Sequence, residues 1–321
     1  MGDRSMGGLL PHHPVLYKEV LHALQPRRGV CYVDGTIGAG GHAWGILQAS
    51  APDGLLLGLD LDPKALQLAG ERLSEFGARA ILVQASYATL LQQIQVLGWK
   101  GVGGILLDLG VSSMQLDTPE RGFSFQSDAP LDMRFDPGNS ETAADLVNTL
   151  SEQEIADLIF RYGEERQARK IARAIVSSRP IFTTGHLSQV VSKACGPARQ
   201  KRIHPATLTF QALRIAVNRE LQALERFLPQ AIVALSPGGR LVVIAYHSLE
   251  DRIVKQFLRQ ESRDCICPPK QPVCTCGHRA SITVITRRPL APQEDEIIRN
   301  PRARSARLRA AMKMSEPDQA G

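Results

Sequence analysis

The amino-acid sequence predicts a doubly wound α/β fold, and three observations support that prediction. An apolar run over residues 30–33 ends in Asp34 and leads into a glycine-dense turn and a helical pattern. A second apolar run, 55–59, ends in Asp60. Strand and helix patterns then alternate through residues 30–110, which implies a parallel sheet with right-handed crossovers. Ligands of such sheets bind beside the carboxyl ends of the strands.

The expected elements follow one another along the chain. In the first part, strands are expected over 30–34, 55–60, 79–84 and 104–109, with helices over 43–49, 63–74 and 87–97. From about residue 118 the alternation stops and helical patterns run back to back: one opened by the capping box Ser151 to Glu154, one near 163–177 and one near 206–228. The strand signal returns over 241–245, followed by a helix near 249–259 and a strand near 281–286.

The interrupted strand signal predicts an inserted domain. The late strand, helix and strand are too few to bury a core by themselves, so we expect them to complete the first sheet. Residues 1–117 and 226–321 are thus predicted to form one discontinuous domain, and 118–225 a helical insertion. Two consecutive domains are the alternative.

Composition narrows the functional class. The chain has 321 residues, of which 43% are hydrophobic, and a formal net charge of +6, which favours a polyanionic partner. No apolar run of about 18 residues is present, so no membrane helix is expected. The first ten residues lack the apolar stretch of a signal peptide. Six cysteines in a chain of this length do not suggest a disulfide scaffold, and a reducing, cytoplasmic location is expected.

The glycine turn predicts an adenosine cofactor. Gly38, Gly40 and Ala43 fit the loose dinucleotide fingerprint G-x-G-x-x-A, which by itself is weak. Glycines let the backbone approach a ligand, and Asp60 could accept both ribose hydroxyls. Asp34 would repel a pyrophosphate, whereas its carboxylate suits the cationic groups of S-adenosylmethionine. This favours S-adenosylmethionine over a nicotinamide dinucleotide; a strand, turn and helix without a ligand is the third alternative.

Several motifs in a fixed order, spread over about residues 10–313, resemble the RsmH (MraW) family. They are His12-His13-Pro14-Val15-Leu16, Val33-Asp34-Gly35-Thr36 with Gly38 and Gly40-Gly41-His42, Asp108-Leu109-Gly110-Val111-Ser112-Ser113, Arg121-Gly122-Phe123-Ser124-Phe125, Leu131-Asp132-Met133-Arg134, Tyr162-Gly163-Glu164 and Tyr246-His247-Ser248-Leu249-Glu250-Asp251. The resemblance implies a class I methyltransferase domain with an inserted helical domain, 118–225, that recognises the substrate. It also implies an enzyme that uses S-adenosylmethionine to methylate the N4 amine of a cytidine in the decoding region of 16S rRNA, with the small ribosomal subunit as partner.

The resemblance also implies a set of cofactor-binding residues. Together with Asp34 and Gly38 from the turn, the predicted set is Asp34, Gly38, Gly40, Gly41, His42, Asp60, Tyr87, Asp108 and Gln115. Tyr87 stands where the family often has phenylalanine, and an aromatic ring there could pack on adenine. Taken alone, Tyr87 could equally be a half-buried residue at a helix start, and Gln115 a solvated loop amide.

Methylation of a cytosine amine needs an acceptor for its proton, because the lone pair of that amine is delocalised into the ring. Many amino-methyltransferases present Asp-Pro-Pro-Tyr after the fourth strand, but this chain lacks the prolines and the tyrosine. The 108–113 loop and the segment Tyr246-His247-Ser248 are therefore the expected source of acceptors. The candidate catalytic residues are Asp108, Ser112, Ser113 and His247. A structural role for His247, for instance in anchoring Glu250, is an equal alternative.

Basic residues form three runs that could contact RNA phosphates. The candidates are Arg166, Arg169, Lys170 and Arg173 in the first run and Lys201 and Arg202 in the second, which also holds Lys193, Arg199 and His204. The third is Arg299, Arg302, Arg304, Arg307 and Arg309. Solvated charged faces are the ordinary alternative. A nicotinamide-dependent oxidoreductase and a non-catalytic ribosome-assembly protein are the rival functions, and a homodimer is left open.

Four cysteines form the pattern Cys265-x-Cys267, six residues, then Cys274-x-Cys276, with His278 close behind. This pattern could hold zinc, although C-x-C is tighter than the usual C-x₂-C knuckle. A reduced, exposed loop stiffened by prolines is the alternative, and the tight spacing favours it. The sequence leaves the metal undecided.

Overall fold

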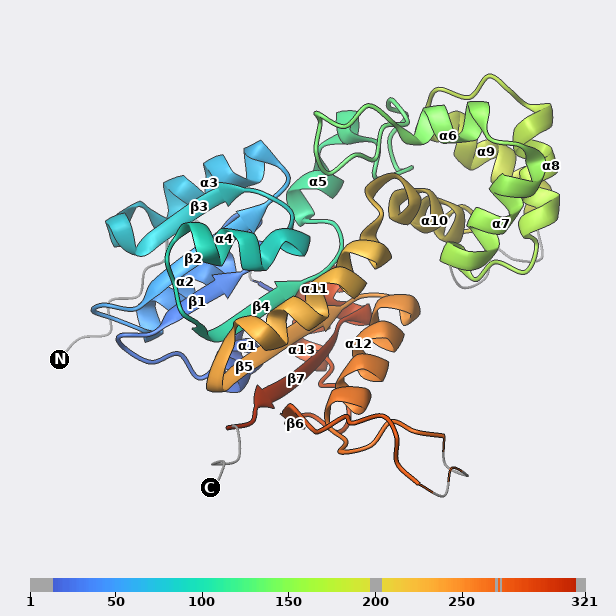
Figure 1. Ribbon diagram of the computed structural model, residues 1–321. Coiled ribbons are helices and arrows are strands. Elements are labelled where there is room, and N and C mark those ends of the chain that lie inside the picture. Colours follow the sequence, from blue (N-terminus) through green and yellow to red (C-terminus); the bar gives the residue numbers. More distant parts are fainter. Residues whose placement is uncertain (1–13, 197–203, 269–270, 272, 316–321) are drawn as a thin grey trace. The chain divides into compact units, whose positions relative to one another are not determined.

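The computed structural model describes residues 14–196, 204–268, 271 and 273–315. The chain divides into two compact units (Figure 1). The sheet unit contains residues 1–60, 64–109 and 228–321, and the helical unit contains 61–63 and 110–227. The helical unit thus begins at 110 rather than at the predicted 118. Each unit is described separately below.

Seven strands form the sheet in the order β3-β2-β1-β4-β5-β7-β6. They are β1 Cys31–Asp34, β2 Leu55–Asp60, β3 Ala80–Gln84, β4 Val102–Asp108, β5 Leu235–Ala245, β6 Ile282–Val284 and β7 Arg307–Lys313. Strands β1 to β5 pair in parallel, whereas β7 runs antiparallel between β5 and β6. The order reverses between β1 and β4, as in a doubly wound sheet, which confirms the predicted α/β fold.

Strand β7 corrects the expectation of a third basic run. Arg307 and Arg309 lie in this strand, two residues apart and therefore on the same face of the sheet. Arg309 is only 7% exposed, and its guanidinium donates to both carboxylate oxygens of Asp251 at 2.7 and 3.0 Å. Arg299 is paired with Asp295 in its own helix. The third run is therefore not one continuous face for phosphates, because part of its charge is used inside the sheet unit.

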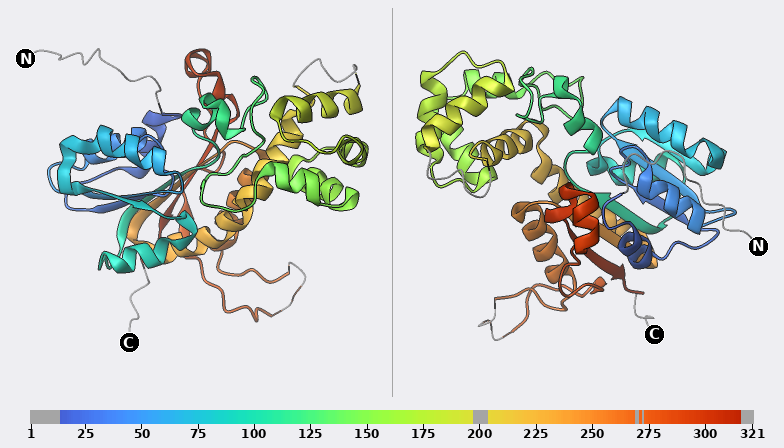
Figure 2. Two further views of the ribbon diagram at one scale, coloured as in Figure 1. Left: turned by 90° about the horizontal axis from the view of Figure 1, so that it is seen from above. Right: turned by 180° about the vertical axis from the view of Figure 1, so that it is seen from behind.

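Helices cover both faces of the sheet (Figures 1 and 2). They are α1 Tyr17–Leu24, α2 Gly41–Ala49, α3 Pro63–Leu73, α4 Leu90–Val96, α12 Ser248–Glu261 and α13 Glu294–Arg299, with the later part of α11 Glu220–Ala234; 3-10 turns are η1 Ser74–Arg79, η2 Tyr87–Thr89 and η5 Pro301–Ser305. Helices α1, α2 and α3 share one buried core with β1, β2 and β5, including Leu16, Ile46 and Val242. The Gln230 side chain of α11 accepts the Leu91 N–H of α4 and donates to the Ala88 carbonyl of η2.

The helical unit has its own core. Its elements are α5 Ser113–Asp117, η3 Pro119–Arg121, α6 Ala143–Thr149, α7 Glu152–Gly163, α8 Ala168–Ser177, α9 Thr184–Cys195, α10 Thr207–Asn218 and the start of α11. Their apolar faces meet in a cluster that includes Ile155, Ile171, Leu187 and Leu213. The capping box at Ser151 and Glu154 is confirmed.

Two predicted helix boundaries in this unit were wrong. The helix expected near 206–228 is two helices, broken at Arg219, whose φ of 49° lies in the left-handed region. The helix expected from 163 begins at Ala168, because Gly163 and Glu164 end the preceding helix and Glu164 also has a positive φ. Among the residues that the structure describes, no helix is both long enough and apolar enough to cross a membrane.

Candidate active site

Three carboxylates mark one edge of the sheet. Asp34, Asp60 and Asp108 are the last residues of β1, β2 and β4, which are neighbours in the sheet and run in parallel. Their side chains therefore lie at the same edge, as the sequence predicted from the ends of the apolar runs. This edge is where a doubly wound sheet binds its ligand.

Asp34 is the most buried of the three, at 1% exposure. Burial raises the pKa of Asp34 from 3.8 to about 7, the carboxylates of Asp108 and Asp60 add to the rise, and His42 and a hydrogen bond from the Thr36 N–H oppose it. A group with this pKa is partly ionised at neutral pH. The edge is thus rich in negative charge and responds to a nearby cation.

The glycines of the turn serve different purposes. Gly38 has a φ of 50°, its N–H donates to the Asp60 carboxylate at 2.9 Å, and the nearest atom to an added Cβ would be 3.9 Å away. An added Cβ on Gly40 would lie 3.3 Å from Ala69 Cα, and one on Gly41 would lie 2.5 Å from Pro14 Cγ. Gly38 therefore leaves open space beside the backbone, whereas Gly40 is required by its φ of 76° and Gly41 by its packing against Pro14.

His42, in the first turn of α2, is buried without hydrogen bonds. It is 6% exposed, and neither ring nitrogen has a hydrogen-bond partner among the described residues. Its Nε2 lies 3.6 Å from Asp108 Oδ2, and its ring stacks on Tyr17. Buried polar atoms are usually paired, so an imidazole of this kind suits a ligand that the protein binds. Helix α2 also begins without a side-chain cap.

The other two predicted cofactor residues of the sheet unit lie at the ends of neighbouring strands. Tyr87 opens η2, directly after β3, and is partly buried with its Cβ beside Gly35. Asp60 ends β2 and already accepts the Gly38 N–H through one carboxylate oxygen. Their contacts with adenine and ribose stay predictions.

Asp108 is held by Tyr246, which the sequence analysis placed in the segment expected to supply acceptors. The Tyr246 hydroxyl donates to Asp108 Oδ1 at 2.9 Å, and burial together with Asp108 raises the pKa of Tyr246 well above 10. The Asp108 N–H donates to Thr36 Oγ1 at 2.7 Å, and its side chain remains 24% exposed. Asp108 is thus fixed by two contacts and still accessible. The sequence predicted that the segment of Tyr246 supplies acceptors, but it did not predict that the Tyr246 hydroxyl donates to Asp108.

His247 caps helix α12. Its Nδ1 accepts the Glu250 N–H at 3.4 Å, and its Nε2 lies 3.1 Å from Glu250 Oε1. Glu250 is 1% exposed and also accepts the N–H groups of Tyr246 and His247. The structure thus shows the anchoring of Glu250 that the sequence left as the alternative. The catalytic role of His247 stays a prediction.

A cap-preserving substitution separates the two roles of His247. We expect the His247→Asn variant to keep its turnover within a few-fold of the parent chain, because an asparagine side chain can still accept an N–H of α12. His247→Ala should lower the free energy of unfolding by about 1 kcal/mol, the usual cost of a lost cap. Steady-state kinetics and urea unfolding measure the two effects. A hundredfold loss of turnover in a normally stable His247→Asn would instead favour the catalytic role.

Ser112, Ser113 and Gln115 lie in the helical unit. Ser112 caps α5, with its hydroxyl accepting the Gln115 N–H at 3.2 Å and the Gln115 side chain accepting the Ser112 N–H at 3.1 Å. Ser113 is the first residue of α5. Gln115 is 5% exposed and donates to Asp62 Oδ2 at 3.1 Å, and Asp62 also pairs with Arg121. The alternative of a solvated amide is therefore wrong, and no pattern in the sequence predicted the contacts with Asp62.

The first basic run is exposed around the start of α8. Arg166, Arg169, Lys170 and Arg173 are all exposed, and only Arg173 is paired in this run, at 3.5 Å from Glu152, among the ion pairs of the described residues. Arg166, Arg169 and Lys170 line one surface pocket of the helical unit together with Asp157 and Phe160, whose side chain is 61% exposed. Of the second run, Arg199, Lys201 and Arg202 lie outside the described residues.

Comparisons with known proteins identify the family. The profile of the MraW methylase family matches residues 9–314. A protein of Dehalococcoides mccartyi named "Ribosomal RNA small subunit methyltransferase H" is 54% identical over 96% of this chain and 88% of its own length. Proteins of the same name from Syntrophotalea carbinolica and Thermomicrobium roseum are 53% and 52% identical, over 94% and 95% of this chain and 98% and 94% of their own lengths. These matches confirm the resemblance inferred from the motifs: this chain belongs to the MraW methylase family.

Proposed function

We propose that this chain transfers the methyl group of S-adenosylmethionine to the N4 amine of a cytidine in the decoding region of 16S rRNA, in the small ribosomal subunit. Membership of a methylase family supports the reaction type, and the name shared by its relatives supports the RNA. A substrate of this kind would place the enzyme in the cytoplasm. The observation that best supports the cofactor is the negative charge at the carboxyl edge of the sheet.

That charge discriminates between the two candidate cofactors. Asp34, Asp60 and Asp108 end three adjacent strands, and the raised pKa of Asp34 reflects both its burial and the nearby carboxylates. S-adenosylmethionine has a positively charged sulfonium and ammonium group, which such an edge attracts. A nicotinamide dinucleotide has a pyrophosphate, which the same carboxylates repel. The electrostatics therefore favour S-adenosylmethionine.

The remaining residues of the edge also fit that cofactor. The turn at Gly38 leaves room beside the backbone, and the buried His42 ring has no hydrogen-bond partner within the described part of the chain. His42, Asp60 and Tyr87 would hold the cofactor, and when bound it supplies an electrophilic methyl group on a positively charged sulfur. The chain itself must then hold the target amine in line with that methyl group.

Asp108 is the best placed proton acceptor. Its carboxylate is partly exposed at the end of β4, so it can accept a hydrogen bond from the cytosine N–H and localise the nitrogen lone pair. As the N–C bond formed and the carbon–sulfur bond of the donor broke, the amine nitrogen would become positive and its proton would pass to this carboxylate. The Tyr246 hydroxyl, kept protonated by its raised pKa, orients Asp108 throughout. Tyr246 is thus a positioning residue.

The helical unit offers a surface for the RNA. Arg166, Arg169 and Lys170 supply positive charge at the pocket beside α8, and the exposed ring of Phe160 can stack on an unpaired base. Asp157 in the same pocket can accept a hydrogen bond from a base edge, while the basic side chains contact phosphates. We therefore propose that this pocket takes part in recognising the rRNA.

Charge reversal tests this surface. We expect the double variant Arg169→Glu/Lys170→Glu to bind the rRNA about tenfold more weakly or worse, and to reduce the slope of log affinity against log salt by about 1 to 2, because two phosphate contacts are lost. Fluorescence anisotropy at several salt concentrations measures both quantities. Arg28→Glu, an exposed arginine of the sheet unit, is the matched control and should leave the slope unchanged. Equal slopes for all three chains would remove α8 from the interface.

The proposed reaction has a direct test. Small subunits isolated from cells that lack this methylation are incubated with the full chain and methyl-labelled S-adenosylmethionine, and the digested nucleosides are identified. We expect labelled N4-methylated cytidine. Normal RNA binding without any methylated nucleoside would favour a ribosome-assembly protein, and saturable binding of NADH in place of S-adenosylmethionine would favour an oxidoreductase.

A further inference from the structure

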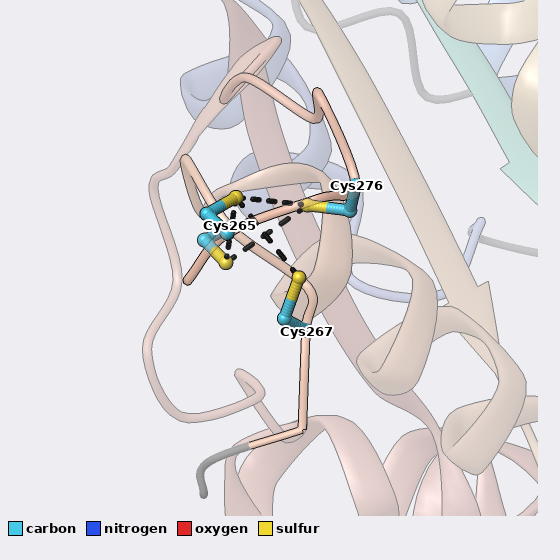
Figure 3. A group of neighbouring side chains, drawn as sticks. Cys265, Cys267 and Cys276 are labelled. Atoms are coloured by element: carbon cyan, nitrogen blue, oxygen red, sulfur yellow. Dashed lines mark hydrogen bonds between the residues drawn. The ribbon is translucent and has the colours of Figure 1, made fainter. Parts of the chain in front are cut away.

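Four cysteine sulfurs meet in the loop between α12 and β6 (Figure 3). We call them the cysteine cluster: Cys265, Cys267, Cys274 and Cys276. Their Sγ atoms all lie within 4.8 Å of one another. The separate distances are 3.4 Å from Cys265 to Cys274, 3.6 Å from Cys274 to Cys276, 3.9 Å from Cys276 to Cys265 and 4.0 Å from Cys267 to Cys274.

These distances match the ligand shell of a single metal ion. A tetrahedral zinc site with Zn–S bonds of about 2.3 Å places its sulfurs about 3.8 Å apart. A disulfide would need a separation of about 2.0 Å, and all four cysteines are free. A cluster of several irons would insert iron and sulfide between the cysteines and hold their sulfurs farther apart. The two C-x-C segments therefore each supply two corners of one tetrahedron.

Apolar packing does not explain why the described part of this loop is ordered. No described residue between 263 and 280 is buried, and the two aliphatic side chains Ile266 and Val273 are 43% and 68% exposed. Ordering a loop of this length costs conformational entropy, and here no apolar burial offsets it. Coordination of a metal by four side chains would offset this entropy, because the ion binds only as the loop becomes ordered.

Hydrogen bonds that do not involve the four sulfurs hold the base of the loop. The Ser281 N–H donates to the Glu261 carbonyl at 2.8 Å. His278 lies near the base, with Nδ1 2.8 Å from the Arg263 carbonyl and Nε2 3.5 Å from Glu261 Oε1. Because both ring nitrogens face these groups, His278 serves the base of the loop and the ligand set is the four sulfurs.

We propose that the cysteine cluster binds one zinc ion, which closes the loop between α12 and β6. Each thiol releases its proton to solvent and coordinates as a thiolate, so no oxidation or reduction takes place. All four positions of the tetrahedron are filled by the chain, which is the pattern of a structural site rather than a catalytic one. The ion thus replaces the apolar core that this loop lacks.

Metal analysis of the full, untagged chain tests the proposal. We expect about one zinc per chain by mass spectrometry of the metal after purification without chelators. The Cys274→Ser variant removes the sulfur that is close to all three others and should bring zinc to background. Cys31→Ser is the matched control: Cys31 lies in β1, outside the loop, so this variant should keep its zinc.

A second measurement does not depend on any variant. Cobalt(II) added to the reduced, metal-free parent chain should produce the intense absorption of a tetrahedral thiolate site, and one equivalent of zinc should abolish it. Two results would overturn the proposal: a parent chain with background zinc and no cobalt absorption, or an intact mass showing that the four thiols are oxidised in pairs.

Discussion

The Asp108→Asn variant is expected to transfer methyl groups about 10²- to 10⁴-fold more slowly than the parent chain, the usual contribution of a positioned acid or base. Asparagine has nearly the same shape, and its carbonyl oxygen can still accept the Tyr246 hydroxyl. It cannot take up the proton that leaves the target amine. The loss should therefore appear in single-turnover rates on rRNA particles, while calorimetry with S-adenosylmethionine shows the cofactor still bound.

Tyr246→Phe provides the companion measurement. It removes the hydroxyl that orients Asp108 but leaves the carboxylate, so we expect a smaller loss, of about tenfold. Asp251→Asn is a control elsewhere in the sheet unit, where the carboxylate pairs with Arg309; it should lower stability more than the rate. Turnover within threefold of the parent chain in Asp108→Asn would exclude Asp108 as the proton acceptor.

The affinity for S-adenosylmethionine is expected to rise as the pH increases from about 6 to about 8. Asp34 has a pKa raised to about 7 in the ligand-free chain, so it is largely protonated at the lower pH. A cationic ligand favours the carboxylate and lowers this pKa, so binding releases a proton. Affinity should therefore increase by up to about tenfold per pH unit below the ligand-free pKa, and level off above it.

The raised pKa of Asp34 also makes the stability of the ligand-free chain depend on pH. Because the pKa of Asp34 is higher in the folded chain than the ordinary 3.8, the folded state keeps a proton that the unfolded state releases. Its contribution to the free energy of unfolding should be full below about pH 4 and lost as the pH rises to about 7. Asp34→Asn should remove this dependence.

Calorimetry in two buffers of different ionisation enthalpy measures the released proton directly. Asp34→Asn should bind S-adenosylmethionine without that proton and with a flatter pH profile. Asp53→Asn, which changes a half-exposed acid away from the sheet edge, is the matched control and should retain both effects. Affinity that is independent of pH in the parent chain would show that Asp34 does not respond to the cofactor.

Local patterns made part of the site predictable. The apolar runs that end in Asp34, Asp60 and Asp108 give the strands and their carboxyl edge, because a parallel sheet aligns the ends of its strands whatever the sequence between them. The glycine turn was predictable because few residues other than glycine adopt the left-handed backbone found at Gly38. The family motifs then indicated the reaction and the RNA.

Other features depended on contacts between distant segments. Strand β7 was missed because its alternation is weak and its two arginines resemble a solvated run, whereas pairing with Asp251 buries Arg309. The substrate-recognition role of the helical unit and the site residues stay proposals. Gly41 belongs to the glycine turn seen in the sequence, but its need for glycine comes from its packing against Pro14.

The sequence by itself determined the α/β class, the acidic edge and the methylase family. The first two follow from patterns of neighbouring residues, and the family follows from motifs that occur in a fixed order. Only the tertiary structure decided that Tyr246 holds Asp108, that His247 caps α12, and that four sulfurs meet at metal-ligand distance. The physical reason is that hydrophobic periodicity records which face of an element is buried, but not which distant side chain will meet it there.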